Sequence, residues 1–449
     1  MKLIDRLSLT EALQIIWPLA LAQMAGATNH ICDRLFLAHS GDAVLEASLP
    51  ALMVSTLVCA FFTATIGYSS TFVAQLHGGG HGREAVKAFA QGLYLAGFAI
   101  PVFALLVPVA FGIIDFAAHA DSVNSAEKAY LAIHINGGVF QTLNAVLGGL
   151  LTGQGKTRFV SAATIGGCLL NIALDPLLIF GCGPIAALGI TGAATASVLG
   201  TALTTALLAA ATARDPLVRA NRDALRLDGV LLRRILRFGS PIGLTAFAGC
   251  LAFTVFTLVI GRLDDLSSAA STTVFTVNNV FYLALCSTSE GICILTGRHH
   301  GAGDEGATRR AFVSGLLIVG TALVACFAVI LPMSGSIMDL FRGANSTFDP
   351  AHYRTVGSTL FLFMFVREIA ESVLCLTNGA LRGVGDTKFV MRTQVLCDLF
   401  IWTPSVLLVY VFTNSLYALW LTMPLNLGLM GFLLIRRWRS GAWRTGRLT

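Results

Sequence analysis

The chain has few charged residues and lacks the motifs of soluble enzymes. Only 12% of its 449 residues are charged, about half of the ~25% that soluble globular domains carry. The sequence contains no HExxH or GxSxG motif, and its HGGGHG and HGAGDE segments do not match a phosphate-binding P-loop. We therefore expect neither an enzyme nor a bound cofactor.

Cysteine and basic residues are present, but not in the patterns of metal or nucleic-acid sites. The ten cysteines form no CxxC pair, and most lie inside apolar runs, as Cys168, Cys250 and Cys326 do. Such cysteines behave as small packed hydrophobic residues, so we expect no metal site built on them. The net charge of +6 is explained below by membrane topology, and no nucleic-acid partner is expected.

Long apolar runs make up most of the chain. Hydrophobic residues account for 55% of it, and one helical crossing of the ~30 Å hydrocarbon core needs roughly 20 residues. This predicts an all-α integral membrane protein with twelve transmembrane helices. The expected spans are 11–37, 46–75, 86–114, 126–151, 158–181, 188–212, 236–261, 268–296, 311–337, 356–381, 391–413 and 415–435.

The Lys and Arg residues fall on alternate connections between these spans. If the N-terminus is cytoplasmic, 24 of the 30 lie on the cytoplasmic side, where such residues are enriched. The others lie on the opposite side or within spans: Lys128, Arg262, Arg342, Arg354, Arg34 and Arg367. An odd number of spans would destroy this separation. We therefore predict that both termini are cytoplasmic, in a bacterial inner membrane.

The two halves of the sequence repeat each other. Residues 149–159 (GLLTGQGKTRF) align without gaps with 379–389 (GALRGVGDTKF), and HGGGHG at 77–82 corresponds to HGAGDE at 300–305. Six spans per repeat give both halves the same orientation, so a pseudo-twofold axis along the membrane normal is expected. The expected parts are an N-terminal six-helix lobe at 1–212, a basic cytoplasmic linker at 213–235, and a C-terminal six-helix lobe with a basic tail at 236–449.

Several motifs, in this order, resemble the multidrug and toxic compound extrusion (MATE) family over nearly the whole chain. They are Pro18 followed by Asp33, FVAQLHGGG after the second span, LLNIALDPLLIFG at 169–181, GITGAATAS at 189–197 and GALRGVGDT at 379–387. The resemblance implies two bundles of six helices that form a V-shaped cleft. It also implies alternating access and antiport coupled to protons or sodium ions.

The resemblance further implies a cation-coupling site in the N-terminal lobe at Asp33, Asn171, Asp175 and Ser197. Asn171 and Asp175 are four residues apart, so they share one face of a helix. The four side chains supply oxygen ligands only, as Na⁺ requires, and an apolar setting also favours a protonated carboxyl group. Apart from Na⁺ here, no metal is expected. The alternative is a hydrogen-bond network that ties helices together.

A second cluster of charged residues lies in the tenth span. Glu371, eleven residues before Arg382, has the spacing of an acidic residue in the family, whereas Gly249 occupies the approximate place of the family's glutamate on the seventh helix. Arg367 is four residues from Glu371, and Glu368 shares that face. Two acids and one base suit a cationic substrate or a second proton. Alternatively, the three form an internally satisfied ion triad.

Four other residues within spans are candidates for a structural or functional role. Pro18 is expected to kink the first helix. His30, one turn before Asp33, is either a proton relay or a hydrogen-bonded packing residue. Glu290 belongs either to the acidic site of the C-terminal lobe or to the nearby cytoplasmic loop. Asp398 lies in the eleventh span, and the sequence offers no partner for it.

The surplus of acids within spans favours a cationic substrate. We expect a secondary transporter that exports an amphiphilic organic cation, which some of the 29 phenylalanines contact by stacking and cation–π attraction. The alternative is a flippase of the related superfamily, which moves lipid-linked sugars or other lipids and should carry Lys and Arg in its cleft to bind phosphate. We expect a monomer surrounded by membrane lipid.

Overall fold

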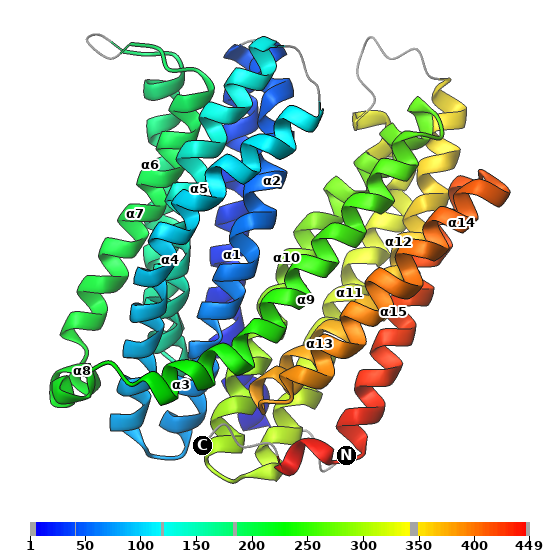
Figure 1. Ribbon diagram of the computed structural model, residues 1–449. Helices are drawn as coiled ribbons and strands as arrows, with labels where there is room; N and C mark the ends of the chain where they lie inside the picture. Colours follow the sequence, from blue (N-terminus) through cyan, green and yellow to red (C-terminus); the bar gives the residue numbers. More distant parts are fainter. Residues whose placement is uncertain (1–5, 41, 118–120, 183–185, 342–348, 446–449) are drawn as a thin grey trace. The chain divides into compact units, whose positions relative to one another are not determined.

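The computed structural model describes residues 6–40, 42–117, 121–182, 186–341 and 349–445. Every element in these ranges is a helix (Figure 1). The elements are α1 (Arg6–Ser40), α2 (Asp42–Gly67), α3 (Ser69–Gly78), α4 (Gly82–Ala117), α5 (Asp121–Gly153), α6 (Thr157–Ile179), α7 (Ile190–Arg214), α8 (Pro216–Ala220), η1 (Arg222–Ala224), α9 (Gly229–Gly261), α10 (Asp265–Gly301), α11 (Glu305–Phe341), α12 (Pro350–Gly383), α13 (Thr387–Val395), the π-helix η2 (Leu396–Trp402), α14 (Thr403–Thr413), α15 (Leu416–Arg439) and η3 (Ala442–Thr445).

Twelve helical stretches within the described ranges are long enough to cross a membrane. Nine of them are also strongly apolar. The other three are α1, α5 and α12, with 35, 33 and 34 residues; at 1.5 Å per residue each exceeds the ~30 Å of a hydrocarbon core. Two stretches are composite, α2 with α3 and α13 with η2 and α14. The predicted all-helical membrane fold with twelve spans is confirmed.

The internal repeat is visible in the local geometry of its turns. Gly80 and Gly303, 223 residues apart, have φ angles of +80° and +77°. Gly155 and Gly385, 230 residues apart, have φ angles of +83° and +92°. Only glycine adopts such a left-handed conformation without steric cost, which is why it ends a helix here. The aligned segments of the two halves therefore form the same turns.

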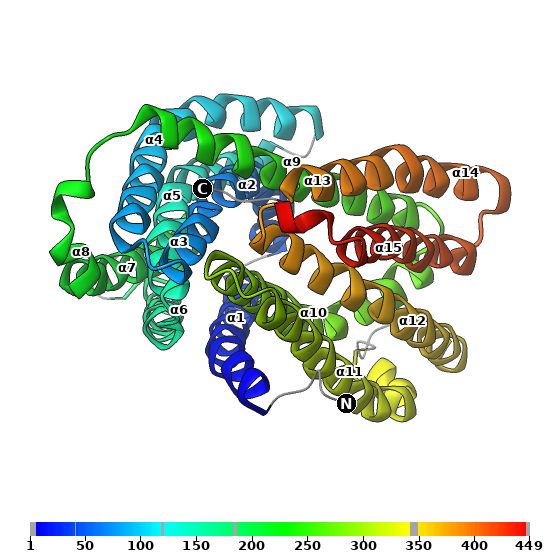
Figure 2. The same cartoon turned by 90° about the horizontal axis from the view of Figure 1, so that it is seen from below.

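The chain forms two compact units. The first consists of Trp17–Ala246 with the short segment Gly297–Gly303. In this unit α5 is central and packs against α2, α3, α4 and α7, while α6 packs against α7 (Figure 2). With the composite α2–α3 counted once, the unit contains six of the twelve stretches.

The segment predicted as a linker is fastened to the first turns of α4. Arg83 forms an ion pair with Asp223 (2.7 Å), and Lys87 forms one with Asp228 (2.5 Å). The fully buried side chain of Gln91 accepts a hydrogen bond from the Asp228 backbone N–H (2.8 Å). The hydrogen bond from Lys87 lowers the pKa of Asp228. The linker is thus an ordered part of the first unit, held by its own charges.

The second unit consists of the start of α1 up to Ile16, Phe247–Thr296 and the described chain from Asp304 onward. Here α12 packs against both α11 and α15. An aromatic cluster fills the core: Phe275 stacks on Trp420 at 4.8 Å and Phe256 on Trp402 at 5.5 Å between ring centroids. Trp402 ends η2, so this cluster anchors the π-helical turn that interrupts the eleventh span.

Candidate functional site

The N-terminal site is built on α6. Asn171 and Asp175 lie four residues apart on this helix, and their exposed fractions are 3% and 0%. The Asn171 amide donates to Ser197 Oγ on α7 at 2.9 Å. The structure therefore brings together three of the four predicted residues of this site.

Two glycines explain why α6 and α7 approach so closely at this point. A Cβ atom on Gly167 would lie 2.5 Å from the carbonyl oxygen of Gly200, and one on Gly200 would lie 2.6 Å from that of Gly167. Real Cβ atoms are not found at such distances, so any larger residue would push the helices apart. The Gly200 Cβ position is also 3.0 Å from Asn171 Cβ. Glycine at these two positions lets Asn171 reach Ser197.

The fourth predicted residue, Asp33 on α1, is half-buried and interacts with the carboxyl group of Asp175. Both carboxyl oxygens of Asp175 are enclosed, and no amide, hydroxyl or basic group among the described residues donates a hydrogen bond to them. The amide oxygen of Asn171 is likewise enclosed without a partner in the described ranges. The site thus presents several acceptor atoms, as a site for a proton or a small cation requires.

Asn29 is a residue of this region that sequence reasoning missed. It lies one turn before Asp33 on α1, is 8% exposed, and its amide oxygen has no hydrogen-bond partner among the residues described. Positions four apart share one helix face. The Asn-x-x-x-Asp spacing of Asn29 and Asp33 is the same as that of Asn171 and Asp175, and this repeated pattern was the signal available in the sequence.

Two of the predicted contributions of α1 have different outcomes. Pro18 lies inside α1, is buried, and its carbonyl oxygen accepts a hydrogen bond from Ser161 Oγ of α6 at 2.5 Å. This contact ties α1 to the helix that carries Asn171 and Asp175. The side chains of His30 and of Arg34, which follows Asp33, lie outside the described part of the structure.

The second cluster lies on α12, in the second unit. Arg367 forms ion pairs with both Glu368 and Glu371, the latter at 3.1 Å from Nη2 to Oε2. All three residues are at least 91% buried. Asn278 of α10 donates to Glu368 (2.9 Å), and the Cys375 thiol donates to Glu371 (3.2 Å). The ion pairs of the triad, which the sequence analysis gave as the alternative to a substrate or proton site, are present, and Arg367 is shared between both acids.

Asp398 has partners that the sequence did not reveal. It lies in the π-helix η2, is 6% exposed, and accepts a hydrogen bond from Asn426 of α15 at 3.1 Å. A Cβ atom added to Gly249 would meet only Asp398 Oδ2, at 3.9 Å. The carboxyl group of Asp398 therefore faces the position that, by the family resemblance, a glutamate of the seventh helix would occupy. π-Helical turns often occur at functional sites.

Glu290 is not joined to the α12 triad by an ion pair. It is half-buried on α10, and no described Lys or Arg pairs with it. Among the described residues, no hydrogen bond or ion pair joins Glu290 to Arg367, Glu368 or Glu371.

Comparison with known proteins adds independent information. The family model MatE matches residues 18–177 and 241–404. These segments begin at Pro18 and Pro241, 223 residues apart, which is the spacing of the Gly80 and Gly303 turns. The probable multidrug resistance protein NorM of Deinococcus radiodurans is 28% identical over 385 residues, which cover 84% of this chain and 82% of that protein.

Two solved structures share the fold over almost the whole chain. A MATE protein in complex with MaL6 is 18% identical, with a TM-score of 0.86 and 97% of both chains covered. A transporter of the MOP superfamily from Pyrococcus furiosus, described for the reverse polarity of its binding pocket, is also 18% identical. Its TM-score is 0.84, and the match covers 98% of this chain and 97% of that one.

Proposed function

The chain belongs to the multidrug and toxic compound extrusion family, and from this premise we propose that it exports organic cations in exchange for protons or sodium ions. In this proposal, movement of the lobes expected at 1–212 and 236–449 opens the substrate site alternately to the two sides of the membrane. The coupling cation binds in the N-terminal lobe, at Asp33, Asn171, Asp175 and Ser197.

The enclosed carboxyl group of Asp175 is the observation that supports this proposal most directly. It interacts with the carboxyl group of Asp33, and no amide, hydroxyl or basic group among the described residues donates a hydrogen bond to it. Two carboxyl groups attract each other only if they share a proton or a cation, because two close carboxylates in a low-dielectric site repel each other. The pair therefore requires an exchangeable positive charge.

Such a site couples transport to an ion gradient by linkage. When a proton or cation binds to the Asp33 and Asp175 carboxyl groups, their net charge and the hydrogen bonding of Asn171 change. The conformation that binds the substrate then changes in stability relative to the other conformation. If the ion lowers the affinity for substrate, the substrate lowers the affinity for the ion by the same factor. This reciprocity is the thermodynamic requirement for antiport.

In the same proposal, the α12 cluster supplies the attraction for a cationic substrate. When both are ionised, Glu368 and Glu371 bring two negative charges against one positive charge on Arg367, which pairs with both. The second carboxyl oxygen of Glu368 is enclosed without a hydrogen-bond partner in the described ranges. One surplus negative charge inside the membrane is costly, and an organic cation offsets that cost.

The test is efflux of a fluorescent organic cation in inverted membrane vesicles that contain the protein. A proton gradient and a sodium gradient are imposed in separate experiments. We expect one of them to drive uptake into the vesicles, and Asp175→Asn to remove that dependence. Vesicles without the protein are the control. Transport that is indifferent to both gradients contradicts the proposal.

The flippase alternative predicts a different electrostatic environment. A lipid-linked phosphate needs basic side chains in the cleft, yet Arg367 in the middle of α12 is already engaged by two acids. The solved structure described for the reverse polarity of its binding pocket has the same fold, so the fold by itself does not decide between the two alternatives. Translocation of a fluorescent lipid-linked sugar by the same vesicles, with no cation efflux, supports the alternative.

We also propose that both termini face the cytoplasm, because of the distribution of Lys and Arg over the connections. A reporter enzyme that is active only in the periplasm, fused after Thr449, should give no signal. The same reporter inserted at residue 119, between the end of α4 and the start of α5, should be active. This insertion serves as the positive control. Activity at the C-terminus contradicts this orientation.

A further inference from the structure

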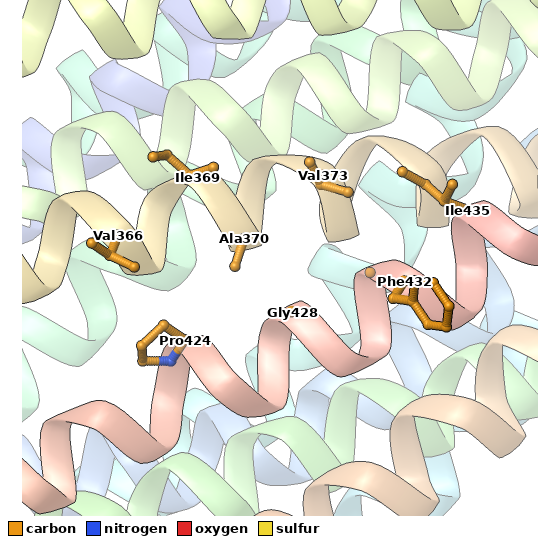
Figure 3. A pocket seen from close by; sticks show the side chains of 9 residues that line it. Val366, Ile369, Ala370, Val373, Pro424, Gly428, Phe432 and Ile435 are labelled. Atoms are coloured by element: carbon orange, nitrogen blue, oxygen red, sulfur yellow. The ribbon is translucent and has the colours of Figure 1, made fainter.

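An apolar groove of about 410 Å³ runs between α12 and α15, within the second unit (Figure 3). Val366, Ile369 and Val373 of α12 line one side, and Gly428, Phe432 and Ile435 of α15 line the other. Val366, Ile369 and Phe432 are 53%, 45% and 62% exposed. In a membrane-spanning chain, exposed apolar side chains are accessible to the acyl chains of the bilayer, and such side chains line the groove on both helices.

Two glycines of α15 determine where the groove is open. At Gly431 an added Cβ would lie 3.3 Å from Val373 Cγ1, so the helices are in close contact there. At Gly428, one turn earlier, an added Cβ would meet no atom within 4 Å. The helices therefore touch at Gly431 and leave space beside Gly428.

The length of the groove corresponds to one leaflet. Its lining on α15 extends from Pro424 to Ile435, which at 1.5 Å per residue is about 17 Å. Half of the hydrocarbon core is about 15 Å thick. An acyl chain of a phospholipid in that leaflet therefore has the length to fill the groove from end to end.

The groove ends at exposed positive charge. Arg436 lies four residues after Phe432, and Arg439 lies four residues after Ile435, so both continue the face of α15 that lines the groove. Both are exposed, and neither forms an ion pair with a described residue. Arg437, between them, is instead paired with Asp386 at 2.7 Å.

The end of α15 is held in a defined rotation. Trp438 is 8% exposed and contacts Phe312 of α11 at 5.1 Å between ring centroids. Trp443 of η3 stacks on Trp438 at 4.7 Å and donates a hydrogen bond to its carbonyl oxygen (2.9 Å). With Trp438 packed inward, its neighbours on the helix cannot rotate away from the mouth of the groove.

We propose that the groove and the two arginines form a binding site for one anionic phospholipid. One acyl chain lies between α12 and α15, and the phosphate is bound by Arg436 and Arg439. Basic clusters at the ends of membrane helices attract anionic head groups, and an adjacent groove adds apolar contact along the acyl chain. The site does not depend on the transported substrate; only its assignment to the cytoplasmic leaflet rests on the proposed orientation of the termini.

The test uses the full chain in nanodiscs of phosphatidylcholine mixed with phosphatidylglycerol, and counts retained lipids by native mass spectrometry. We expect one phosphatidylglycerol molecule to remain on the wild type. Gly428→Leu adds a side chain in the groove at a position where an added Cβ meets no atom within 4 Å, and it should release the lipid. Arg436→Gln with Arg439→Gln should weaken retention roughly thirty-fold, since each basic residue near the surface contributes about 1 kcal/mol.

Two matched controls separate this site from general effects. Gly320→Leu on α11 adds the same side chain at a glycine that also has no atom within 4 Å of an added Cβ. Arg233→Gln with Arg234→Gln removes two exposed charges from α9. Both control variants should retain the lipid, and all variants should unfold at the wild-type temperature in pure phosphatidylcholine.

Three results would overturn the proposal. The first is equal retention of phosphatidylcholine and phosphatidylglycerol by the wild type. The second is the same loss of lipid in the arginine controls on α9 as in the Arg436 and Arg439 variant. The third is a dimer that Gly428→Leu dissociates, which would assign the groove to a second copy of the chain.

Discussion

The two buried acidic clusters differ in how their negative charge is compensated. On α12, Arg367 is within the same helix as Glu368 and Glu371 and forms ion pairs with both. On α6, Asp175 forms no ion pair with a described Lys or Arg, and its interaction is with another carboxyl group, that of Asp33. One cluster carries its own positive charge, and the other has no basic partner among the described residues.

From this difference we propose different roles for the two clusters. An ion triad that includes its own base is stable in one arrangement, and removing that base leaves buried charges without a partner. A pair of acids without a base changes state whenever a proton or cation binds or leaves, which is the property that coupling requires. We therefore expect substitutions on α12 to act mainly on stability, and substitutions on α6 to act mainly on coupling.

The largest effect on stability is expected from Arg367→Met. Two buried carboxyl groups lose their common partner, and breaking a buried pair in this way costs about 3–5 kcal/mol. The measurement is thermal unfolding in detergent, together with expression yield. Adding Glu371→Gln to this variant should recover part of the loss. A stable Arg367→Met protein would show that the triad is not structural.

Glu371→Gln should have the second largest effect on stability. It removes a hydrogen bond to a charged group, worth about 1.5–3 kcal/mol, and removes the surplus negative charge of the cluster. We expect a lower unfolding temperature and a higher KM for the organic cation, with unchanged dependence on the ion gradient. Loss of export at wild-type stability would instead assign coupling to α12 and reverse the comparison.

Asp175→Asn should leave stability close to that of the wild type. The amide can donate to Asp33, so the two groups no longer need a shared cation. Drug affinity should lose its dependence on pH or sodium, a coupling worth about 1–3 kcal/mol in typical cases. Calorimetry of drug binding across pH and sodium concentration measures this change. Asp33→Asn should behave similarly, with little further effect in the double variant, whereas full ion dependence in both single variants places coupling elsewhere.

The smallest effect is expected from Ser197→Ala. It removes the hydroxyl that accepts the hydrogen bond from Asn171 at 2.9 Å, which is worth about 1 kcal/mol. Both unfolding temperature and ion affinity should decrease slightly. Ser197→Thr retains the hydroxyl and is the matched control. If both variants have the same ion affinity as the wild type, Ser197 is a packing residue and not part of the cation site.

The candidate site was predictable where its residues lie on one helix. Asn171 with Asp175, and Arg367 with Glu371, are separated by four residues, and this spacing alone places each pair on one face. The contact between Asp33 and Asp175 followed from the family resemblance and not from spacing, because it joins different helices. Asn29 was missed although its sequence pattern repeats that of Asn171 and Asp175.

The sequence by itself determined the membrane class, the twelve helices and the repeated turns at Gly80, Gly155, Gly303 and Gly385. These follow from local properties, namely the length of apolar runs and the conformational freedom of glycine. Only the tertiary structure decided that Asp398 meets Asn426, that Arg367 is shared by two acids, and that a groove opens at Gly428. Such contacts depend on how each helix is rotated about its axis and how closely its neighbours approach, and packing across the whole unit decides both.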